Sequence, residues 1–285
     1  MPSCCIVIPV YRPFTEAEMG VLRHNLTMLS AYPAALIGGP GQRGLLDALA
    51  VQLAGETGAE IGVELFADDD FRGIDGYNRL LTGAAFFQRF AAFSHVLICQ
   101  HDALILRDTL AEWLTPDYGF VGAPMFRGYH APERPLRFLS SLNGGLSLRH
   151  VPAALDVLRE MIPVRRSRLM RAAGRLGLIR AANTVLAGAT RRRIVLRRAG
   201  LNEDVFWTEV VPAVFPGFRV PTPETAARFA FETCPADLFA LTDDLPFGCH
   251  AFQRYDPGFW AAHAPAEVAP VLAACAADAG GEAKA

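Results

Sequence analysis

The order of short apolar runs and amphipathic stretches constrains the fold of this chain most strongly. Apolar runs typical of buried strands cover residues 4–10, 35–38, 61–66, 95–99 and 119–123. Among them lie stretches with apolar residues at helical spacing, over 17–30, 45–53 and 77–91. A further helix is expected from about 152 to 161. Alternating strands and helices predict an α/β fold with a mostly parallel central sheet.

The composition is that of a chain with a full core. Of its 285 residues, 52% are hydrophobic, yet no apolar run approaches the roughly 18–20 residues of a membrane-spanning helix. The first residues lack the basic segment and cleavage site of a secretory signal, so we interpret them as a first strand. The six cysteines form no Cys-x-x-Cys pair, which indicates reduced thiols and favours a cytoplasmic location.

Charge is distributed unevenly along the chain. Residues 165–198 hold eleven of the 27 basic residues and no acidic one, which leaves 16 basic against 29 acidic side chains elsewhere, a charge of −13. This pattern predicts a basic helical insertion at about 163–199. The insertion could be a solvated surface, an amphipathic element that lies on anionic lipid, or a binding site for an anionic acceptor. Nucleic acid is disfavoured because the segment has no aromatic residue for base stacking.

One polar triplet follows a predicted core strand. Gln100, His101 and Asp102 come directly after the apolar run 95–99. Parallel sheets bind ligands at the carboxyl ends of their strands. Asp102 could therefore ligate manganese or magnesium together with substrate phosphates, but it could equally cap a helix or pair with an arginine.

Other candidates lie in the second half of the chain. Glu203 and Asp204 precede an apolar run, where acids either stabilise a helix start or act as a general base. His250 could be a metal ligand or a structural imidazole. A glycine-rich turn is predicted over 141–150, where glycines would let a ligand approach closely. The acidic run 68–70 is interpreted as a solvated loop.

Eight short motifs in order resemble one family. They are IVIPVYRP, GIDGYNRLL, LICQHDALIL, FVGAPMF, NGGLSLR, NEDVFW, FAFE and LPFGCHAF, between about residues 5 and 260. Together they resemble the family catalogued as domain of unknown function 5672, itself similar to GT-A-fold glycosyltransferases. The resemblance implies one GT-A-like, Rossmann-like domain over 1–262. We expect the alanine-rich tail, 263–285, to be poorly ordered.

The resemblance also implies a donor site. GT-A enzymes hold a divalent cation between the donor diphosphate and an Asp-x-Asp motif at a strand end. Here Gln100, His101 and Asp102 occupy that place, with Asp102 as metal ligand and Gln100 in place of the first aspartate. His250 matches the late histidine that completes the metal site. Pro9, Val10 and Tyr11 would line the nucleotide base. A single carboxylate also leaves metal independence open.

The acceptor side follows from the same resemblance. Asn143, Gly144 and Gly145 would flank the acceptor, Asp204 would be the general base, and Glu203 would hold an acceptor hydroxyl.

The hypothesis is therefore a metal-assisted, inverting glycosyltransferase of the hexosyltransferase type. It would use a nucleotide-diphosphate sugar and a glycan or lipid-linked acceptor of the cell envelope. We expect it in the cytoplasm, with 165–198 able to hold it on the inner face of the membrane. The alternatives are a non-catalytic nucleotide-sugar-binding relative that lost a carboxylate at Gln100, and a peripheral membrane scaffold built around 165–198.

Overall fold

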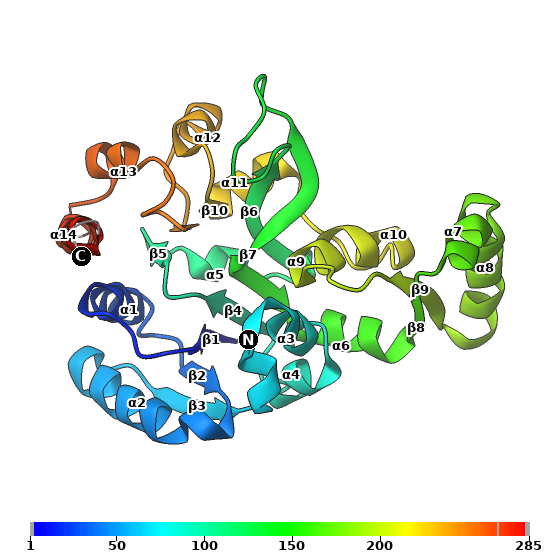
Figure 1. Ribbon diagram of the computed structural model, residues 1–285, viewed down its shortest axis with the longest axis horizontal. Helices are drawn as coiled ribbons and strands as arrows, with labels where there is room; N and C mark the ends of the chain where they lie inside the picture. Colours follow the sequence, from blue (N-terminus) through cyan, green and yellow to red (C-terminus); the bar gives the residue numbers. More distant parts are fainter. Residues whose placement is uncertain (1–2, 267, 283–285) are drawn as a thin grey trace.

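A six-stranded sheet forms the centre of the molecule (Figure 1). The computed structural model describes residues 3–266 and 268–282. The strand order is β3-β2-β1-β4-β7-β6, with bounds β1 Cys4–Pro9, β2 Ala34–Gly38, β3 Ile61–Leu65, β4 His95–Cys99, β6 Phe120–Phe126 and β7 Phe138–His150. Strands β3, β2, β1 and β4 are parallel, β7 runs antiparallel to β4, and β6 runs antiparallel to β7. The predicted α/β fold with a mostly parallel sheet is confirmed.

Helices cover both faces of this sheet. They include α1 Glu16–Met28, α2 Arg43–Thr57, α3 Gly73–Leu81, α4 Ala84–Arg89, α5 Leu110–Trp113 and α6 Val151–Glu160, with short 3-10 turns at Pro40–Gln42 and Asp68–Phe71. Helix α1 begins with a capping box, in which Thr15 accepts from Glu18 N and the Glu18 carboxylate accepts from Thr15 N. The single helical stretch expected over 77–91 is two helices, because Thr82 ends α3 and Gly83 is extended.

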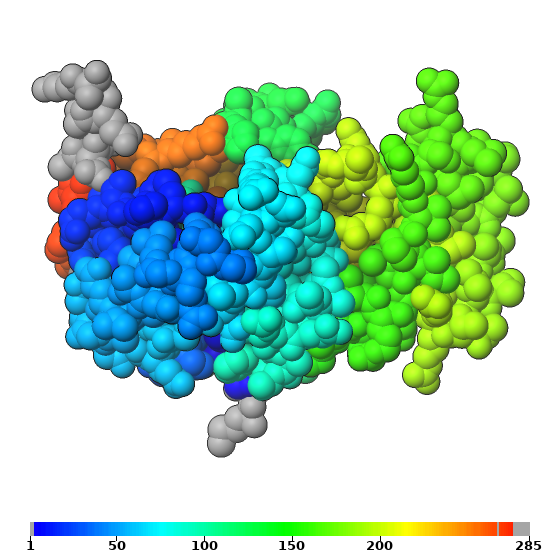
Figure 2. Space-filling view, turned by 60° about the horizontal axis from the view of Figure 1, so that its bottom comes forward, coloured from blue at the N-terminus to red at the C-terminus, as the bar shows by residue number. Residues whose placement is uncertain are grey.

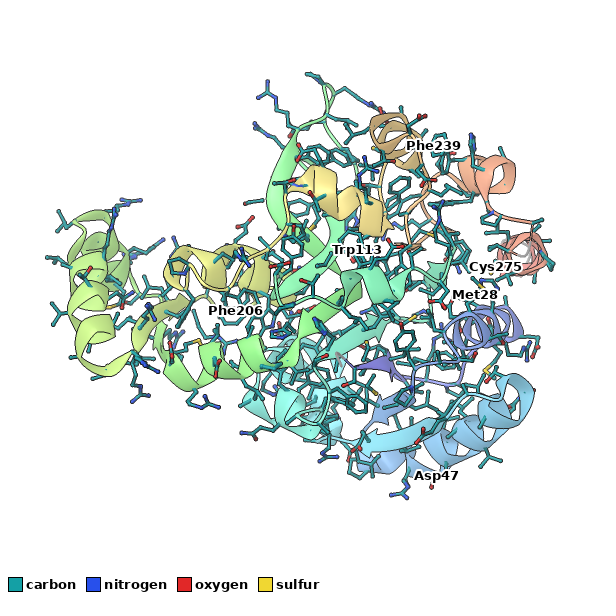
Figure 3. The ribbon with its side chains drawn as sticks, turned by 180° about the vertical axis from the view of Figure 1, so that it is seen from behind. Met28, Asp47, Trp113, Phe206, Phe239 and Cys275 are labelled. Atoms are coloured by element: carbon teal, nitrogen blue, oxygen red, sulfur yellow. The ribbon has the colours of Figure 1, made fainter. Side chains whose placement is uncertain are left out.

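The alternation of side chains along β1 builds two cores. Ile6 and Ile8 belong to the cluster shared with α1 and α2, whereas Cys5 and Val7 belong to the cluster shared with α3, α4 and α6. Side chains fill the space between the sheet and its helices, and Phe206 lies on the side toward the α7–α8 region (Figure 3). Strands β1 and β4 are therefore packed on both faces up to the ends that precede the polar residues.

A second, three-stranded sheet brings the late part of the chain back to this edge. Its order is β10-β11-β5, with bounds β10 Ala230–Phe231, β11 Gly248–His250 and β5 Ala103–Ile105. In the register of β11 and β5, His250 pairs with Ala103. This pairing sets His250 beside the segment that follows Asp102. The surrounding helices are α9 Glu203–Val205, the π-helix Phe206–Val210, α10 Val211–Val214, α11 Pro223–Phe229, α12 Pro235–Thr242 and α13 Pro257–His263.

The arginine-rich segment projects from one end of the molecule (Figures 1 and 2). We call residues 161–198 the basic lobe. It consists of β8 Met161–Arg165, α7 Arg168–Arg175, α8 Leu178–Thr190 and β9 Arg193–Arg197. The two strands pair in parallel and close the ends of the helical part. The segment contains two helices, and these are bounded by strands that its charge pattern did not indicate.

Two predicted local structures differ from the observed ones. Residues 141–150 are part of strand β7 and not a turn, because their backbone pairs with both β4 and β6. In the tail that we expected to be poorly ordered, helix α14 covers Ala269–Glu282, and Val268 and Cys275 are buried. Residues 267 and 283–285 lie outside the described part. Within that part, no helix has both the length and the apolar character needed to cross a bilayer.

Candidate active site

A pocket of about 560 Å³ opens at the carboxyl ends of β1 and β4. Its lining comes from distant parts of the chain, namely Tyr11, Phe71, Gly73, Ile74, Tyr77, Asn78, Gln100, Asn143, Gly144, Gly145, Asn202, Glu203, Asp204 and His250. Most of the residues singled out by sequence therefore meet in one cavity. The exceptions are Pro9, Val10, His101 and Asp102, which do not line it.

The glycine pair on β7 separates two groups of charged side chains. A Cβ on Gly144 would lie 2.3 Å from Glu203 Oε1, and a Cβ on Gly145 would lie 2.0 Å from His250 Nε2. Neither glycine has a positive φ. The pair is therefore needed for close side-chain approach and not for a turn. Gly145 also accepts a hydrogen bond from Gln100 N through its carbonyl, at 3.0 Å.

On one side of the pair, His250 is surrounded by acceptors. Its Nε2 lies 3.3 Å from Gln100 Oε1 and 3.3 Å from Asp102 Oδ1, while Nδ1 lies 3.1 Å from Glu232 Oε1. Burial alone would lower the pKa of His250, but the hydrogen-bonded and charged carboxylates of Asp102 and Glu232 raise it to about 10. Asn143 Nδ2 donates to the same Glu232 oxygen, at 3.1 Å.

The donor atoms at this point suit a divalent cation. Among the described residues, no group of three or more histidine, cysteine, aspartate or glutamate side chains could hold a metal ion. Yet Asp102 Oδ1 is a buried carboxylate oxygen whose one printed neighbour is His250 Nε2, and the same imidazole nitrogen also lies near the Gln100 amide oxygen. Carboxylate, amide and imidazole donors fit manganese or magnesium, and Glu232 on Nδ1 is the outer carboxylate that often orients such a histidine. The set fits a cation, provided His250 loses its proton.

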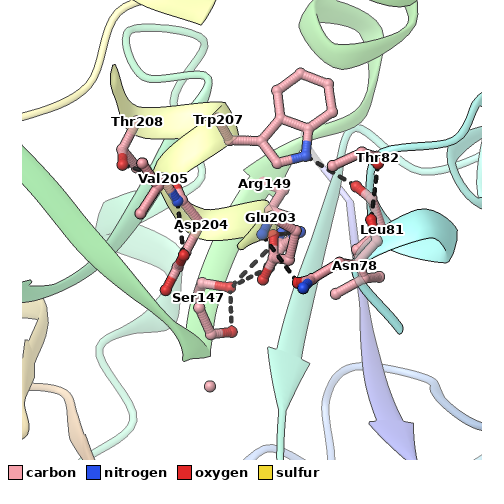
Figure 4. A network of polar contacts seen from close by, with 12 residues as sticks. Asn78, Leu81, Thr82, Ser147, Arg149, Glu203, Asp204, Val205, Trp207 and Thr208 are labelled. Atoms are coloured by element: carbon pink, nitrogen blue, oxygen red, sulfur yellow. Dashed lines mark hydrogen bonds and ion pairs between the residues drawn. The ribbon is translucent and has the colours of Figure 1, made fainter. Parts of the chain in front are cut away.

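On the other side of the pair, Glu203 is held in a buried ion pair (Figure 4). Arg149 donates to both Glu203 oxygens, at 2.7 and 2.8 Å, and its guanidinium lies 4.9 Å from the centre of the Phe120 ring. Glu203 N donates to Asn78 Oδ1 at 2.9 Å. The side chain and the backbone of Glu203 are thus both fixed, and this start of α9 cannot shift without breaking the pair.

The neighbouring Asp204 has a different environment. Its carboxylate is directed away from Arg149 (Figure 4) and accepts a bond from Val205 N at 2.6 Å. Burial and, next, the negative charge of Glu203 raise the pKa of Asp204 to about 7. The N-cap of α9 is Asn202, so neither acid occupies the capping position. A half-buried carboxylate with a pKa near neutrality is suited to take a proton.

An aromatic wall lies at the end of β1. The Tyr11 ring is 5.5 Å from Tyr77 in an edge-on arrangement and 6.0 Å from Phe71. Pro9 and Val10 are buried at the strand end behind Tyr11. The His101 ring stacks on Phe14, and its Nε2 lies 3.4 Å from Glu18 Oε1, so it faces α1 and not the pocket.

Family comparison identifies the chain. The family described as Protein of unknown function (DUF5672) matches residues 60–250, more than half of the sequence. The chain belongs to this family. No curated protein matches this DUF5672 member.

Some solved glycosyltransferases are weakly similar to this DUF5672 protein. The glycosyltransferase GlyE of Streptococcus pneumoniae TIGR4 has 11% identity and a TM-score of 0.47, over 96% of this chain and 60% of GlyE. A glycosyltransferase involved in the glycosylation of the major capsid of PBCV-1 has 10% identity and a TM-score of 0.40, over 89% of this chain and 97% of that one. This chain thus spans 60% of the length of GlyE.

Several residues of the site were not singled out by sequence. Glu232 ends the motif FAFE, and an acid directly after an apolar strand was a usable signal. Arg149 is a lone arginine in an apolar stretch, and its near-complete burial was the feature that sequence could not show. Asn78 and Asn202 carry no signal of their own, because asparagine is common at helix ends.

Proposed function

We propose that this DUF5672 protein is a glycosyltransferase that moves a sugar from a nucleotide-diphosphate sugar to a hydroxyl group of an acceptor. The observation that carries this proposal is the arrangement around Gly144 and Gly145. An unpaired carboxylate with a pKa near 7, Asp204, lines the same pocket as Gln100 and His250. A proton acceptor and a phosphate-binding group on opposite sides of one cavity are what glycosyl transfer requires.

The donor would bind on the His250 side. Asp102, Gln100 and His250 would hold a divalent cation, which when bound neutralises charge on the leaving diphosphate. Tyr11 offers an exposed ring edge and face for the nucleotide base, supported by Phe71 and Tyr77. Glu232 would keep the His250 imidazole oriented from behind, through Nδ1.

The acceptor would bind on the Asp204 side. Asp204 takes the proton from the attacking hydroxyl as its oxygen bonds to the anomeric carbon, while the bond from that carbon to the diphosphate breaks. This single displacement inverts the anomeric centre. Each Glu203 oxygen keeps one lone pair beyond its bond to Arg149, with which it would accept a bond from an acceptor hydroxyl.

A panel of sugar nucleotides tests the proposal directly. Wild-type protein, with and without manganese, is expected to hydrolyse one donor slowly in the absence of acceptor. A protein that binds a sugar nucleotide but never hydrolyses or transfers it would be the non-catalytic relative instead. A retained anomeric configuration in the product, read from proton NMR couplings, would overturn the single displacement.

The basic lobe supports an acceptor located at a membrane. Leu169 is exposed on α7, Leu178 and Val185 are exposed on α8, and Leu176 is exposed directly after α7. Exposed apolar residues among arginines are typical of helices that lie on anionic lipid. We propose that the lobe holds the enzyme on the inner membrane face, near a glycan or lipid-linked acceptor of the cell envelope. A scaffold without transfer activity would show the same membrane binding but no donor hydrolysis.

A further inference from the structure

A second cavity, of about 430 Å³, lies beside the candidate active site. It is formed between α3 and the basic lobe, and we call it the arginine groove. Its lining includes Asp75, Asn78, Thr82, Arg165, Arg197 and Arg198. Asn78 lines both this groove and the pocket that contains Asp204. A ligand bound in the candidate active site beside Asn78 could therefore extend into the groove.

Arg197 is a half-buried cation within this groove. Its Nη2 donates to Thr82 Oγ1 at 2.6 Å, and its guanidinium lies 4.9 Å from the centre of the Phe206 ring. No carboxylate pairs with it among the described residues, and burial lowers its pKa. A guanidinium that is partly removed from water without a counter-ion has unused capacity to bind an anion.

Two further arginines of the groove are also without ion pairs in the described chain. Arg165 ends β8, and Arg198 follows β9, and both side chains are exposed. Arg79 is different because its Nη2 contacts Asp70 Oδ1 at 2.9 Å. Asp75 is the one carboxylate in the lining and would face any bound anion unfavourably. Three unpaired arginines against one aspartate leave the groove strongly cationic.

We propose that the arginine groove binds a phosphoryl group carried by the acceptor. This inference rests on the proposed function. Guanidinium groups bind phosphate oxygens in pairs of parallel hydrogen bonds, so three of them suit a phosphate or diphosphate. The groove shares Asn78 with the pocket, and its residues Gly200 and Leu201 lead along the chain to Glu203, whereas no residue of the His250 cluster lines it. This assigns the groove to the acceptor rather than to the donor diphosphate. The substrate class is therefore a sugar or lipid-linked sugar with a phosphate near its reactive hydroxyl.

Hydrogen bonds connect the groove to the catalytic side. Arg197 donates to Thr82 Oγ1, Thr82 Oγ1 donates to the Asn78 carbonyl at 2.7 Å, and Asn78 Oδ1 accepts from Glu203 N. Figure 4 shows Thr82, Asn78 and Glu203 in this order. Arg197, to which the phosphate would bind, is thus bonded to Thr82 at the end of α3. The last turn of α3 also contains Asn78, which fixes the backbone of Glu203, the residue before Asp204.

Calorimetric titration of the full chain with inorganic pyrophosphate, without metal, tests the groove itself. The groove variant, with Arg165→Gln and Arg198→Gln, should bind pyrophosphate about tenfold more weakly for each arginine lost. Arg197→Lys keeps the charge but loses the paired bonds, and should bind more weakly than wild type. The matched control carries Arg171→Gln and Arg175→Gln, two exposed arginines of α7 outside the groove, and should bind as wild type does.

Enzyme kinetics then test whether the phosphoryl group that the groove binds belongs to the acceptor. With a hexose 1-phosphate as acceptor, the groove variant should raise KM with little change in kcat, whereas a methyl hexoside should show no such rise. Equal pyrophosphate affinity in wild type and groove variant, or an equal loss in the α7 control, would overturn the proposal. Loss of binding to phosphatidylglycerol vesicles alone would assign the groove to lipid headgroups instead. If no transfer occurs at all, the proposed function fails, while pyrophosphate binding still decides the groove.

Discussion

Glu203 and Asp204 show how two adjacent carboxylates acquire different chemistry. Glu203 is neutralised by Arg149 in a buried, two-point ion pair. Asp204 has no such partner, so burial and the charge of Glu203 outweigh the hydrogen bond from Val205 N and the charge of Arg149 and raise its pKa to about 7. The pair is a structural acid next to a proton acceptor, and single substitutions can tell the two roles apart.

Asp204→Asn is expected to lower turnover by about two to four orders of magnitude, the usual contribution of a positioned base. Donor affinity should stay unchanged because Asp204 faces the acceptor side. If the acid only stabilised the helix start, the variant would instead lose about 1 kcal/mol of stability and keep its turnover per folded molecule. Melting temperature and turnover measured on one sample distinguish these results.

The pKa of Asp204 also sets the expected pH dependence. A base must be ionised, so kcat/KM should rise with pH and level off above about pH 7. The folded-state pKa is raised above the unfolded value of about 3.9, so this group's contribution to stability falls as pH rises between the two values. The Asp204→Asn variant has no carboxylate to ionise, so it should not lose stability between these pH values. It should melt at or above the wild-type temperature at pH 8. Glu203→Gln should move the activity limb to lower pH, because it removes the repelling charge; an unmoved limb would contradict this account.

At the scale of one element, strand β7 is the part that assembles the site. It carries Gly144 and Gly145 between the acid pair and His250, and Arg149 a few residues further on. Its antiparallel pairing with β4 brings Gly145 next to Gln100. There is no room for a side chain at Gly144 or Gly145. Only the backbone of β7 therefore separates Glu203 from His250.

Gly145→Ala is therefore expected to weaken manganese-dependent binding of a nucleoside diphosphate, because the new Cβ would displace His250 Nε2, 2.0 Å away. Calorimetry should show an effect as large as that of His250→Ala. Gly20→Ala in α1 is the matched control, since its Cβ would meet nothing within 4 Å and alanine favours the helix. Unchanged nucleotide affinity in Gly145→Ala would return His250 to a purely structural role.

At the scale of the whole molecule, charge is separated between two bodies. The basic lobe projects at one end of the molecule (Figure 2) and carries the arginine cluster, while the sequence outside it is acidic. Such a separation orients a protein in the field of an anionic surface. The arginine groove lies where the lobe joins the body, between α3 and the two lobe strands.

Liposome flotation tests this orientation. Wild type should bind vesicles that contain anionic lipid and should dissociate as salt rises, because the interaction is screened. Replacing Arg168, Arg171 and Arg175 of α7 by glutamine should abolish binding. Replacing Arg43, Arg72 and Arg219, which are exposed outside the lobe, should not. Binding that ignores lipid charge and salt would exclude the electrostatic account.

The sequence by itself determined the α/β class and most elements of the central sheet. The predicted runs 95–99 and 61–66 agree with β4 and β3 within a residue at each end, because period-two and helical spacing report local burial directly. It also determined the chemistry of the candidate residues, since Asp102, Asp204 and His250 are titratable groups at element ends.

Only the tertiary structure decided how these groups are used. The β7 segment looked like a turn because two glycines interrupt its pattern, and only pairing with β4 and β6 makes it a strand. Glu232 behind His250, Arg149 against Glu203 and Arg197 beside Thr82 join residues 18 to 115 positions apart in the sequence. Burial raises the pKa of Asp204 more than the charge of its sequence neighbour Glu203 does, and the fold leaves the half-buried Arg197 without a carboxylate partner in the described chain. Neither burial is a property of local sequence, because both depend on what the fold removes from water.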